Sequence, residues 1–335
     1  MTSPEPPPLV TRWDLDKTYL RSDFATARDL LQSALERPDQ KRSVPGASLV
    51  LRELQHRGAH VHVLSGSPKQ LKRRLQQRLA LDGIRVERFT LKPNLENLLR
   101  LRFRALKAQV GFKLSALLVA ASAERSLWPG TPPEVLVGDD SEQDSLVYSL
   151  FADICQGSLS GPELEQLLER AQLYDDERRT ILKLAPELAR AKTDPQFLIL
   201  IHLDRQSPPS SFQVYGGRLV PFFNYMQAAL VLLARGCLDA DAVLRVGAHL
   251  IAEHRFDLEG LTRSFLDLHR RGAVTSQIIA LLRHAGPRTS PLLAGWPNDL
   301  EAALPEGAIA ALPALENTGF RIDYRKLLLP AETHL

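Results

Sequence analysis

This 335-residue sequence has few cysteines and no long apolar run. Its two cysteines, Cys155 and Cys237, cannot build a disulfide framework or a zinc site, and they indicate a reducing compartment. The longest apolar stretch, AALVLLA after Met226, is far shorter than the ~20 residues that a membrane-spanning helix needs. The opening residues MTSPEPPPLV lack the charged start and apolar core of a signal peptide. These features predict a soluble, cytoplasmic protein.

A strong excess of one charge is also missing. The 42 Lys and Arg residues nearly balance the 39 Asp and Glu residues, and a formal net charge of +3 is too small to indicate nucleic-acid binding by itself. Basic residues do cluster between positions 72 and 107, in KRRLQQR and RLRFRALK. Such runs usually form a solvated helix face, and the functional alternative is attraction to an anionic membrane surface or substrate.

What the sequence does contain is an alternation of strand and helix patterns. Apolar or alternating segments predict strands at 9–14, 59–67, 84–91, 133–140 and 195–205. Segments with helical spacing predict helices at 24–36, 46–57, 69–83, 113–124 and 144–154, and two more within 160–192. This order favours right-handed crossovers and a doubly wound, largely parallel α/β sheet. The predicted domains are an α/β domain over 9–205, with a helical insertion near 158–194, and a mainly helical C-terminal accessory region over 206–335.

Polar residues follow several of the predicted strands. Asp14 and Asp16 end the first strand, Ser65 ends the second, and Asp139 and Asp140 follow the strand in PEVLVGDD. Because ligands of parallel sheets bind beyond the carboxyl ends of the strands, we expect these side chains to meet at one edge of the sheet.

The first of these clusters suits phosphoryl transfer. A carboxylate can attack phosphorus and form an aspartyl-phosphate, and a second carboxylate can protonate the leaving oxygen and then activate water. In DLDKT, Asp14 and Asp16 alternate along an extended segment and can therefore face one pocket.

The remaining clusters can supply the other parts of such a site. Ser65, helped by the backbone of Gly66, can hold a phosphoryl oxygen, and Lys113 in GFKLSAL can neutralise the developing charge. In GDDSEQD, Asp139 can bind a hard cation such as Mg²⁺, with Asp140 or Asp144 in support.

In this order, the motifs resemble the haloacid dehalogenase superfamily of Mg²⁺-dependent phosphatases, whose signature is DxDx[TV], a strand-end Ser or Thr, a Lys and an acidic GD motif. The resemblance covers about the first 145 residues. It implies that Asp14 is the nucleophile and Asp16 the general acid/base, with Thr18 completing the motif. It also implies that Ser65 binds phosphate, that Lys113 stabilises charge, and that Asp139, the Asp14 carboxylate and the Asp16 backbone carbonyl hold Mg²⁺.

A narrower resemblance is to the App1-type phosphatidate phosphatase domain. VHVLSGSPKQL, a later Lys and VGDDSEQDSLVY are similar to its SxSPxxL, Lys and GDSGQxDxxxY motifs, and FLILIHLDR resembles its closing IYIR strand, with Arg205 at the arginine. The sequence departs from this family at Lys17, where the first motif usually reads DIDDT, and at Asp140, where the family has Ser. The resemblance implies a phosphatidate-like lipid phosphate as substrate and a peripheral position at a membrane surface.

Two other functions stay open at this point. In one, a catalytically weak or inactive relative binds without turnover, and the helical C-terminal half recruits partners. In the other, the phosphatase acts on polynucleotide ends, and the arginine-rich segment binds the phosphate backbone of the polynucleotide.

Overall fold

The computed structural model describes residues 8–21, 42–92, 105–128, 131–190, 196–304 and 320–328, with the backbone alone at 105–109 and Pro287. Its centre is a six-stranded, all-parallel sheet with the strand order β3-β2-β1-β4-β5-β6. The strands are β1 (Val10–Trp13), β2 (His60–Pro68), β3 (Arg88–Lys92), β4 (Glu134–Asp139), β5 (Phe197–His202) and β6 (Leu219–Phe222). The predicted doubly wound α/β class is therefore confirmed.

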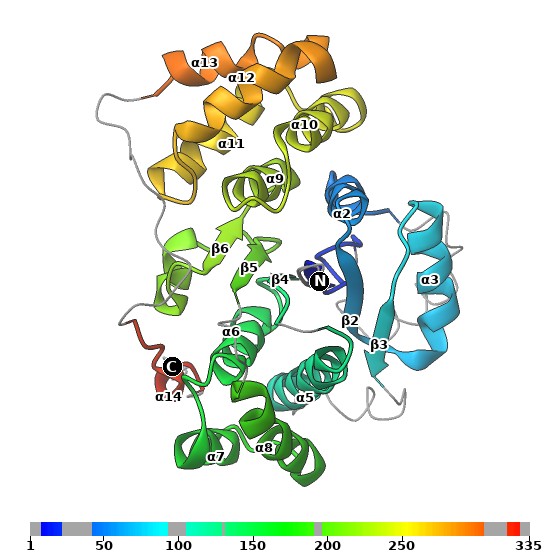
Figure 1. Cartoon of the computed structure of the whole chain (residues 1–335), viewed down its shortest axis with the longest axis vertical. Helices are drawn as coiled ribbons and strands as arrows, with labels where there is room; N and C mark the ends of the chain where they lie inside the picture. Colours follow the sequence, from blue (N-terminus) through cyan, green and yellow to red (C-terminus); the bar gives the residue numbers. More distant parts are fainter. Residues whose placement is uncertain are drawn as a thin grey trace, which may run out of the picture.

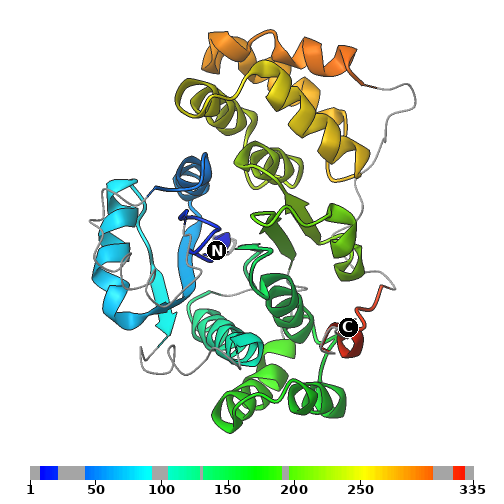
Figure 2. The same ribbon diagram turned by 180° about the vertical axis from the view of Figure 1, so that it is seen from behind.

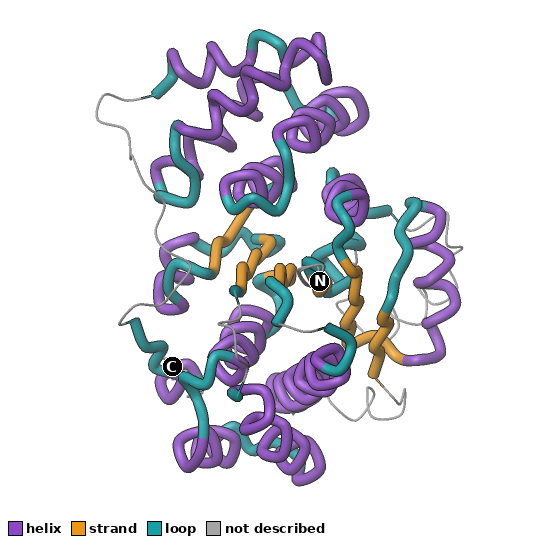
Figure 3. Tube along the Cα trace, viewed as in Figure 1, coloured by secondary structure: helices purple, strands orange, loops and turns teal. Residues whose placement is uncertain are grey.

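Helices cover both faces of the sheet (Figures 1 and 2). On one face lie α2 (Ala47–His56), α3 (Lys72–Leu81) and α9 (Tyr225–Ala234), backed by α10 (Ala240–His254), α11 (Leu258–Arg270), α12 (Gln277–Thr289) and α13 (Trp296–Ala302). On the other face lie α5 (Ala105–Arg125) and α6 (Asp144–Cys155), backed by α7 (Gly161–Arg170), α8 (Asp175–Ala189) and the short α14 (Tyr324–Leu327). Short 3₁₀ helices are η1 (Lys69–Leu71), η3 (Pro209–Tyr215) and η4 (Pro291–Leu293). Figure 3 shows the strands running between these two helical layers.

Local sequence signals explain these elements. All six residues of β4 and of β5 are buried, as expected for central strands of a parallel sheet that is covered on both faces. After α2 and α3, Gly58 and Gly83 have φ angles of +84° and +77°, a left-handed conformation that glycine adopts without strain. The predicted ends of these two helices are therefore confirmed.

The structure also differs from the sequence predictions in its details. β3 begins at Arg88, four residues later than expected, and α5 begins at Ala105, eight residues before its expected start at Lys113. The helix expected at 24–36 lies outside the described residues. The expected helical insertion consists of α7 and α8, and α8 packs on α5 and α6.

The sheet continues beyond the predicted domain boundary at Arg205, because β6 pairs with β5 from Ile199↔Leu219 to His202↔Phe222. One hydrophobic cluster joins the sheet face, α2 and α3 to α9–α13. The helices after β6 therefore share a core with the strands that carry the predicted site. In the described part of the chain, no helix has both the length and the apolar character needed to cross a membrane.

Candidate active site

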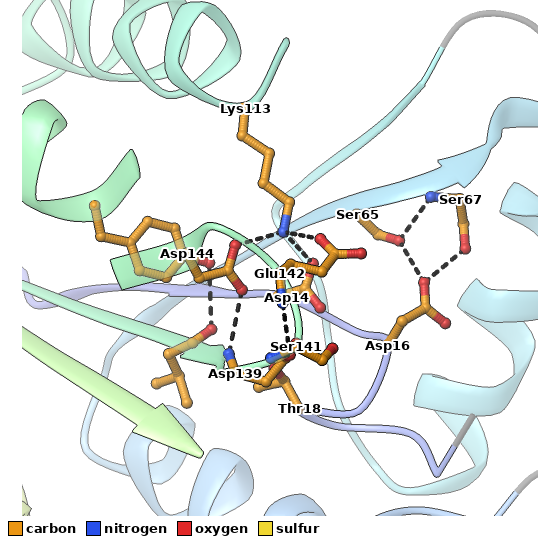
Figure 4. Close-up of polar contacts among 12 residues, drawn as sticks. Asp14, Asp16, Thr18, Ser65, Ser67, Lys113, Asp139, Ser141, Glu142 and Asp144 are labelled. Carbon is orange, nitrogen blue, oxygen red and sulfur yellow. Dashed lines mark hydrogen bonds and ion pairs between the residues drawn. The ribbon is translucent and has the colours of Figure 1, made fainter. Parts of the chain in front are cut away.

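The carboxyl ends of the strands bring most of the predicted site residues together (Figure 4). Asp14 directly follows β1, Ser65 lies near the end of β2, and Asp139 is the last residue of β4. Lys113 reaches this edge from α5, which covers one face of the sheet. The positions of Asp14, Ser65 and Asp139 follow from the parallel topology, because every strand of such a sheet ends at the same edge.

Lys113 is the centre of the charged cluster. Its ammonium Nζ lies 2.9 Å from Asp14 Oδ1, 2.5 Å from Asp144 Oδ1 and 2.7 Å from Glu142 Oε2, and its side chain is 2% exposed. Burial alone would lower the pKa of Lys113, but the negative charges of these three carboxylates raise it well above its ordinary value. Lys113 is therefore a fixed positive charge.

Asp14 has one carboxylate oxygen that the described residues leave unsatisfied. Its Oδ1 accepts a hydrogen bond from Lys113, whereas its buried Oδ2 has no hydrogen-bond partner. Burial raises the pKa of Asp14, Lys113 lowers it, and the negative charges of Asp144, Glu142 and Asp139 raise it further, so that the net shift is well upward. A buried acceptor without a partner costs folding free energy, which makes Oδ2 a candidate for a ligand or a reaction.

Asp14, Asp139 and Asp144 form a buried acidic group. Each offers an oxygen that lies within 4.8 Å of the others. Burial and the neighbouring Asp144 raise the pKa of Asp139 to about 7. Backbone N–H groups of Ser141 (2.6 Å) and Glu142 (3.2 Å) donate to Asp139 Oδ1, and the Thr18 hydroxyl donates to its Oδ2 at 3.3 Å.

Gly138 is needed for this arrangement, because a Cβ there would overlap the side chain of Asp144. The donor atoms of the acidic group are all oxygens, and one of them has no partner. This set fits a hard divalent cation such as Mg²⁺.

The Asp16 side chain contacts the two serines. The Ser67 hydroxyl donates to Asp16 Oδ2 at 2.9 Å and the Ser65 hydroxyl donates to it at 3.2 Å, while the Ser67 N–H donates to Ser65 Oγ at 3.0 Å. Between the serines, a Cβ built on Gly66 has no atom within 4 Å, so there is open space beside this loop. Asp16 and Ser65 thus form a second polar group beside the acidic one (Figure 4).

Lys17 and Asp140 both contact the loop after β5. Asp140 accepts hydrogen bonds from the backbone N–H groups of Arg205 (2.8 Å) and Ser207 (3.1 Å). The Lys17 ammonium lies 3.6 Å from Asp204 Oδ2, and Lys17 itself has a left-handed φ of 61°. Of the two carboxylates predicted to support Asp139, Asp144 lies in the acidic group, whereas Asp140 bonds to the loop after β5.

The sequence analysis missed three residues that shape the site. Glu142 is the third carboxylate on Lys113. His202 Nδ1 donates to the Lys17 carbonyl at 2.9 Å, and the Tyr225 hydroxyl donates to the Thr18 carbonyl at 2.7 Å. Glu142 could have been suggested by its place in GDDSEQD, but the contacts of His202 and Tyr225 join residues far apart in the sequence.

A separate cavity of about 470 Å³ lies between α9, the end of α10 and α11. Asn224, Gln227 and Ser264 in its wall bond to one another, and none of the predicted site residues lines it. This open cleft therefore lies apart from the carboxylate cluster.

Comparison with known proteins gives no family for this chain. No protein-family model matches it. No curated protein and no solved structure matches it either.

Proposed function

We propose that the chain is a Mg²⁺-dependent phosphomonoester phosphatase that works through an aspartyl-phosphate on Asp14. One observation carries the proposal: a buried carboxylate oxygen, Asp14 Oδ2, has no partner, while Lys113 holds the other oxygen. Structural carboxylates in a protein interior normally have all their acceptors satisfied. An oxygen kept free beside a fixed cation is what a carboxylate nucleophile requires.

The chain's own residues can perform both steps. In the first, Asp14 Oδ2 attacks phosphorus, the ester P–O bond breaks, and Asp16 gives its proton to the leaving oxygen. In the second, water attacks the phosphorus of the aspartyl-phosphate, Asp16 takes the proton of that water, and Asp14 is released with inorganic phosphate. The hydroxyls of Ser65 and Ser67 donate to ionised Asp16 and hold its carboxylate in one position.

A cation is required because the site is strongly acidic. Three carboxylates, those of Asp14, Glu142 and Asp144, contact the ammonium of Lys113, and a fourth, that of Asp139, lies beside Asp14 and Asp144. Asp14 and Asp139 would hold Mg²⁺, with Asp144 beside them, and the ion would neutralise charge so that a phosphate group can approach.

For the substrate we propose a phosphatidate-like lipid phosphate. Two observations support a bulky substrate. The space beside Gly66 is open. The described residues between Ser65 and Lys113 belong to β2, η1, α3, β3, α5 and their connections, and none of them builds a separate cap over the site.

The test is Mg²⁺-dependent hydrolysis of 4-nitrophenyl phosphate by the full chain and by Asp14→Asn. Removing the nucleophile should lower the rate by on the order of 10³-fold or more. The matched control is Asp299→Asn, which changes an exposed carboxylate on α13 and should leave the rate as it is. Turnover that survives Asp14→Asn, or wild-type protein without turnover, contradicts the proposal. Good turnover of small sugar phosphates without turnover of dispersed phosphatidate contradicts the lipid substrate alone.

A further inference from the structure

Glu142 is the most accessible of the three carboxylates that surround Lys113. It lies in the loop between β4 and α6, and its side chain is 21% exposed, whereas those of Asp14 and Asp144 are 1% and 0% exposed. Its carboxylate still lies 2.7 Å from the Lys113 ammonium. A residue at the rim of the site thus reaches the same cation as two fully buried ones.

Carboxylates surround the ammonium of Lys113, which donates hydrogen bonds to Asp14 and Asp144 and forms an ion pair with Glu142. A lysine side chain carries three N–H donors, and three carboxylates lie within 3 Å of this one. A phosphoryl oxygen can reach Lys113 only if one carboxylate leaves. Asp144 cannot leave easily, because it packs against Gly138 and accepts a hydrogen bond from the Asp139 N–H. Asp14 is the proposed nucleophile, so Glu142 is the carboxylate that must move.

A second lysine lies at the same edge of the sheet. Lys92 is the last residue of β3, at the same edge of the sheet, and its side chain is half-buried. Burial lowers the pKa of Lys92, and the negative charges of Glu177 and Glu142 act against that shift. The charge of Glu142 therefore acts on both Lys113 and Lys92.

We propose that Glu142 competes with the phosphoryl group for Lys113 and turns to Lys92 when that group binds, so that Glu142 sets the affinity of the site for phosphate. The proposal rests on the proposed function, because it places the phosphoryl group at Lys113. It adds two residues, Glu142 and Lys92, that determine how strongly an anionic substrate binds.

Inorganic phosphate is the probe, and its affinity is measured by calorimetry in the presence of Mg²⁺. Glu142→Gln removes the competing charge and should tighten phosphate binding by about tenfold, equivalent to ~1.4 kcal/mol. Lys92→Met keeps the apolar stem but removes the alternative partner of Glu142, and it should weaken phosphate binding severalfold. The double variant should bind as tightly as Glu142→Gln, since Lys92 acts only through Glu142.

The matched control is Glu165→Gln, which removes an exposed negative charge on α7 and should leave phosphate affinity unchanged. Thermal unfolding of every variant shows that it is folded. Steady-state kinetics with 4-nitrophenyl phosphate give a second readout. Glu142→Gln should lower KM and change kcat little, because the lost interaction competes with binding and not with the reaction.

Three results would overturn the inference. One is equal phosphate affinity of wild type and Glu142→Gln. Another is that Lys92→Met weakens phosphate binding by the same factor in the wild type and in Glu142→Gln, which would mean that Lys92 contacts phosphate directly. The third is that none of the proteins binds phosphate. The proposed function would be rejected, and the role of Glu142 kept, if the wild type showed no turnover but the phosphate affinities of the single and double variants were as expected. If turnover depended on Asp14 but Glu142→Gln had no effect, the proposed function would stand and the role of Glu142 would be rejected.

Discussion

At the scale of single residues, Asp140 shows how a neighbouring carboxylate can be excluded from the acidic group. It directly follows Asp139, but successive side chains of an extended segment point in opposite directions. Its two carboxylate oxygens accept hydrogen bonds from the backbone N–H groups of Arg205 and Ser207. Lys17 approaches the same loop through Asp204. Lys17 and Asp140 therefore both tie the loop after β5 to the neighbourhood of the site.

This arrangement predicts a stability defect for Asp140→Ala. The loop would lose two hydrogen bonds to a charged acceptor, and the free energy of unfolding should fall by about 2 kcal/mol. Asp140→Asn keeps one acceptor oxygen and should lose about half as much. Urea unfolding measures both changes, and calorimetric titration with Mg²⁺ should give the wild-type affinity. If Asp140 were a Mg²⁺ ligand, the alanine variant would instead lose Mg²⁺ affinity at nearly unchanged stability.

At the scale of elements, a second buried ionic cluster ties α5 to three strands, away from the carboxyl edge. Arg12 of β1 binds Glu124 of α5, with 2.6 Å between Nη2 and Oε2, and it also binds Glu134 of β4. His62 of β2 lies 3.0 Å from Glu124. Burial alone would raise the pKa of Glu124, but the hydrogen bonds and positive charge of His62 and Arg12 lower it from 4.5 to about 2.

This lowered pKa predicts a pH-dependent stability. The pKa of Glu124 in the folded protein lies below its ordinary value. Its contribution to the free energy of unfolding is therefore complete above pH 4.5 and is lost as the pH falls toward about 2. Wild type should exceed Glu124→Gln in free energy of unfolding by about 3 kcal/mol at neutral pH. Urea unfolding between neutral pH and about pH 3 should show this difference shrinking. Burial raises the pKa of the partner Glu134, so the contribution of Glu134 to the free energy of unfolding falls as the pH rises. Glu134 is present in both proteins, so its own pH dependence largely cancels in the difference. A difference that stays constant or grows in acid would contradict the lowered pKa of Glu124. Glu165→Gln, on the exposed side of α7, is the control.

The elements also show how far the sequence could be read. The strands that end at Asp14, Ser65 and Asp139 were predictable, because each is an apolar run followed by polar residues and a helix pattern. β6 was not predicted, since Leu219–Phe222 has only four residues and contains Pro221, which is tolerated at the edge of a sheet. The charge balance around Lys113 was not predictable either. The motif GDDSEQD places Glu142 near the site, but sequence spacing does not determine how far its side chain reaches from the loop.

At the scale of the whole molecule, the helices after Arg205 belong to the structure that carries the site. Trp13 of β1 stacks on Tyr225 of α9, with ring centroids 5.8 Å apart and ring planes at 11°. The Tyr225 hydroxyl then donates to the Thr18 carbonyl in the loop that carries Asp14 and Asp16. The same hydrophobic cluster extends from Trp13 to Trp296 on α13. The loop with the proposed nucleophile is thus supported by residues from the far end of the described core.

This continuity predicts that the chain unfolds as one cooperative unit. Trp13 and Trp296 are each 1% exposed, so each should report the loss of its surroundings through its fluorescence. One variant, Trp128→Phe with Trp296→Phe, keeps Trp13 as the only tryptophan, and another, Trp13→Phe with Trp128→Phe, keeps Trp296. Within each variant, the urea midpoint from fluorescence should coincide with the midpoint from far-UV circular dichroism, as expected for a two-state transition. Comparison within a variant is needed because Trp13→Phe removes the stacking on Tyr225 and lowers stability by itself.

Separate midpoints, with Trp296 changing before or after the bulk of the secondary structure, would show that α10–α13 form an independent domain. In that case a truncated chain ending after α9 should retain Mg²⁺-dependent turnover.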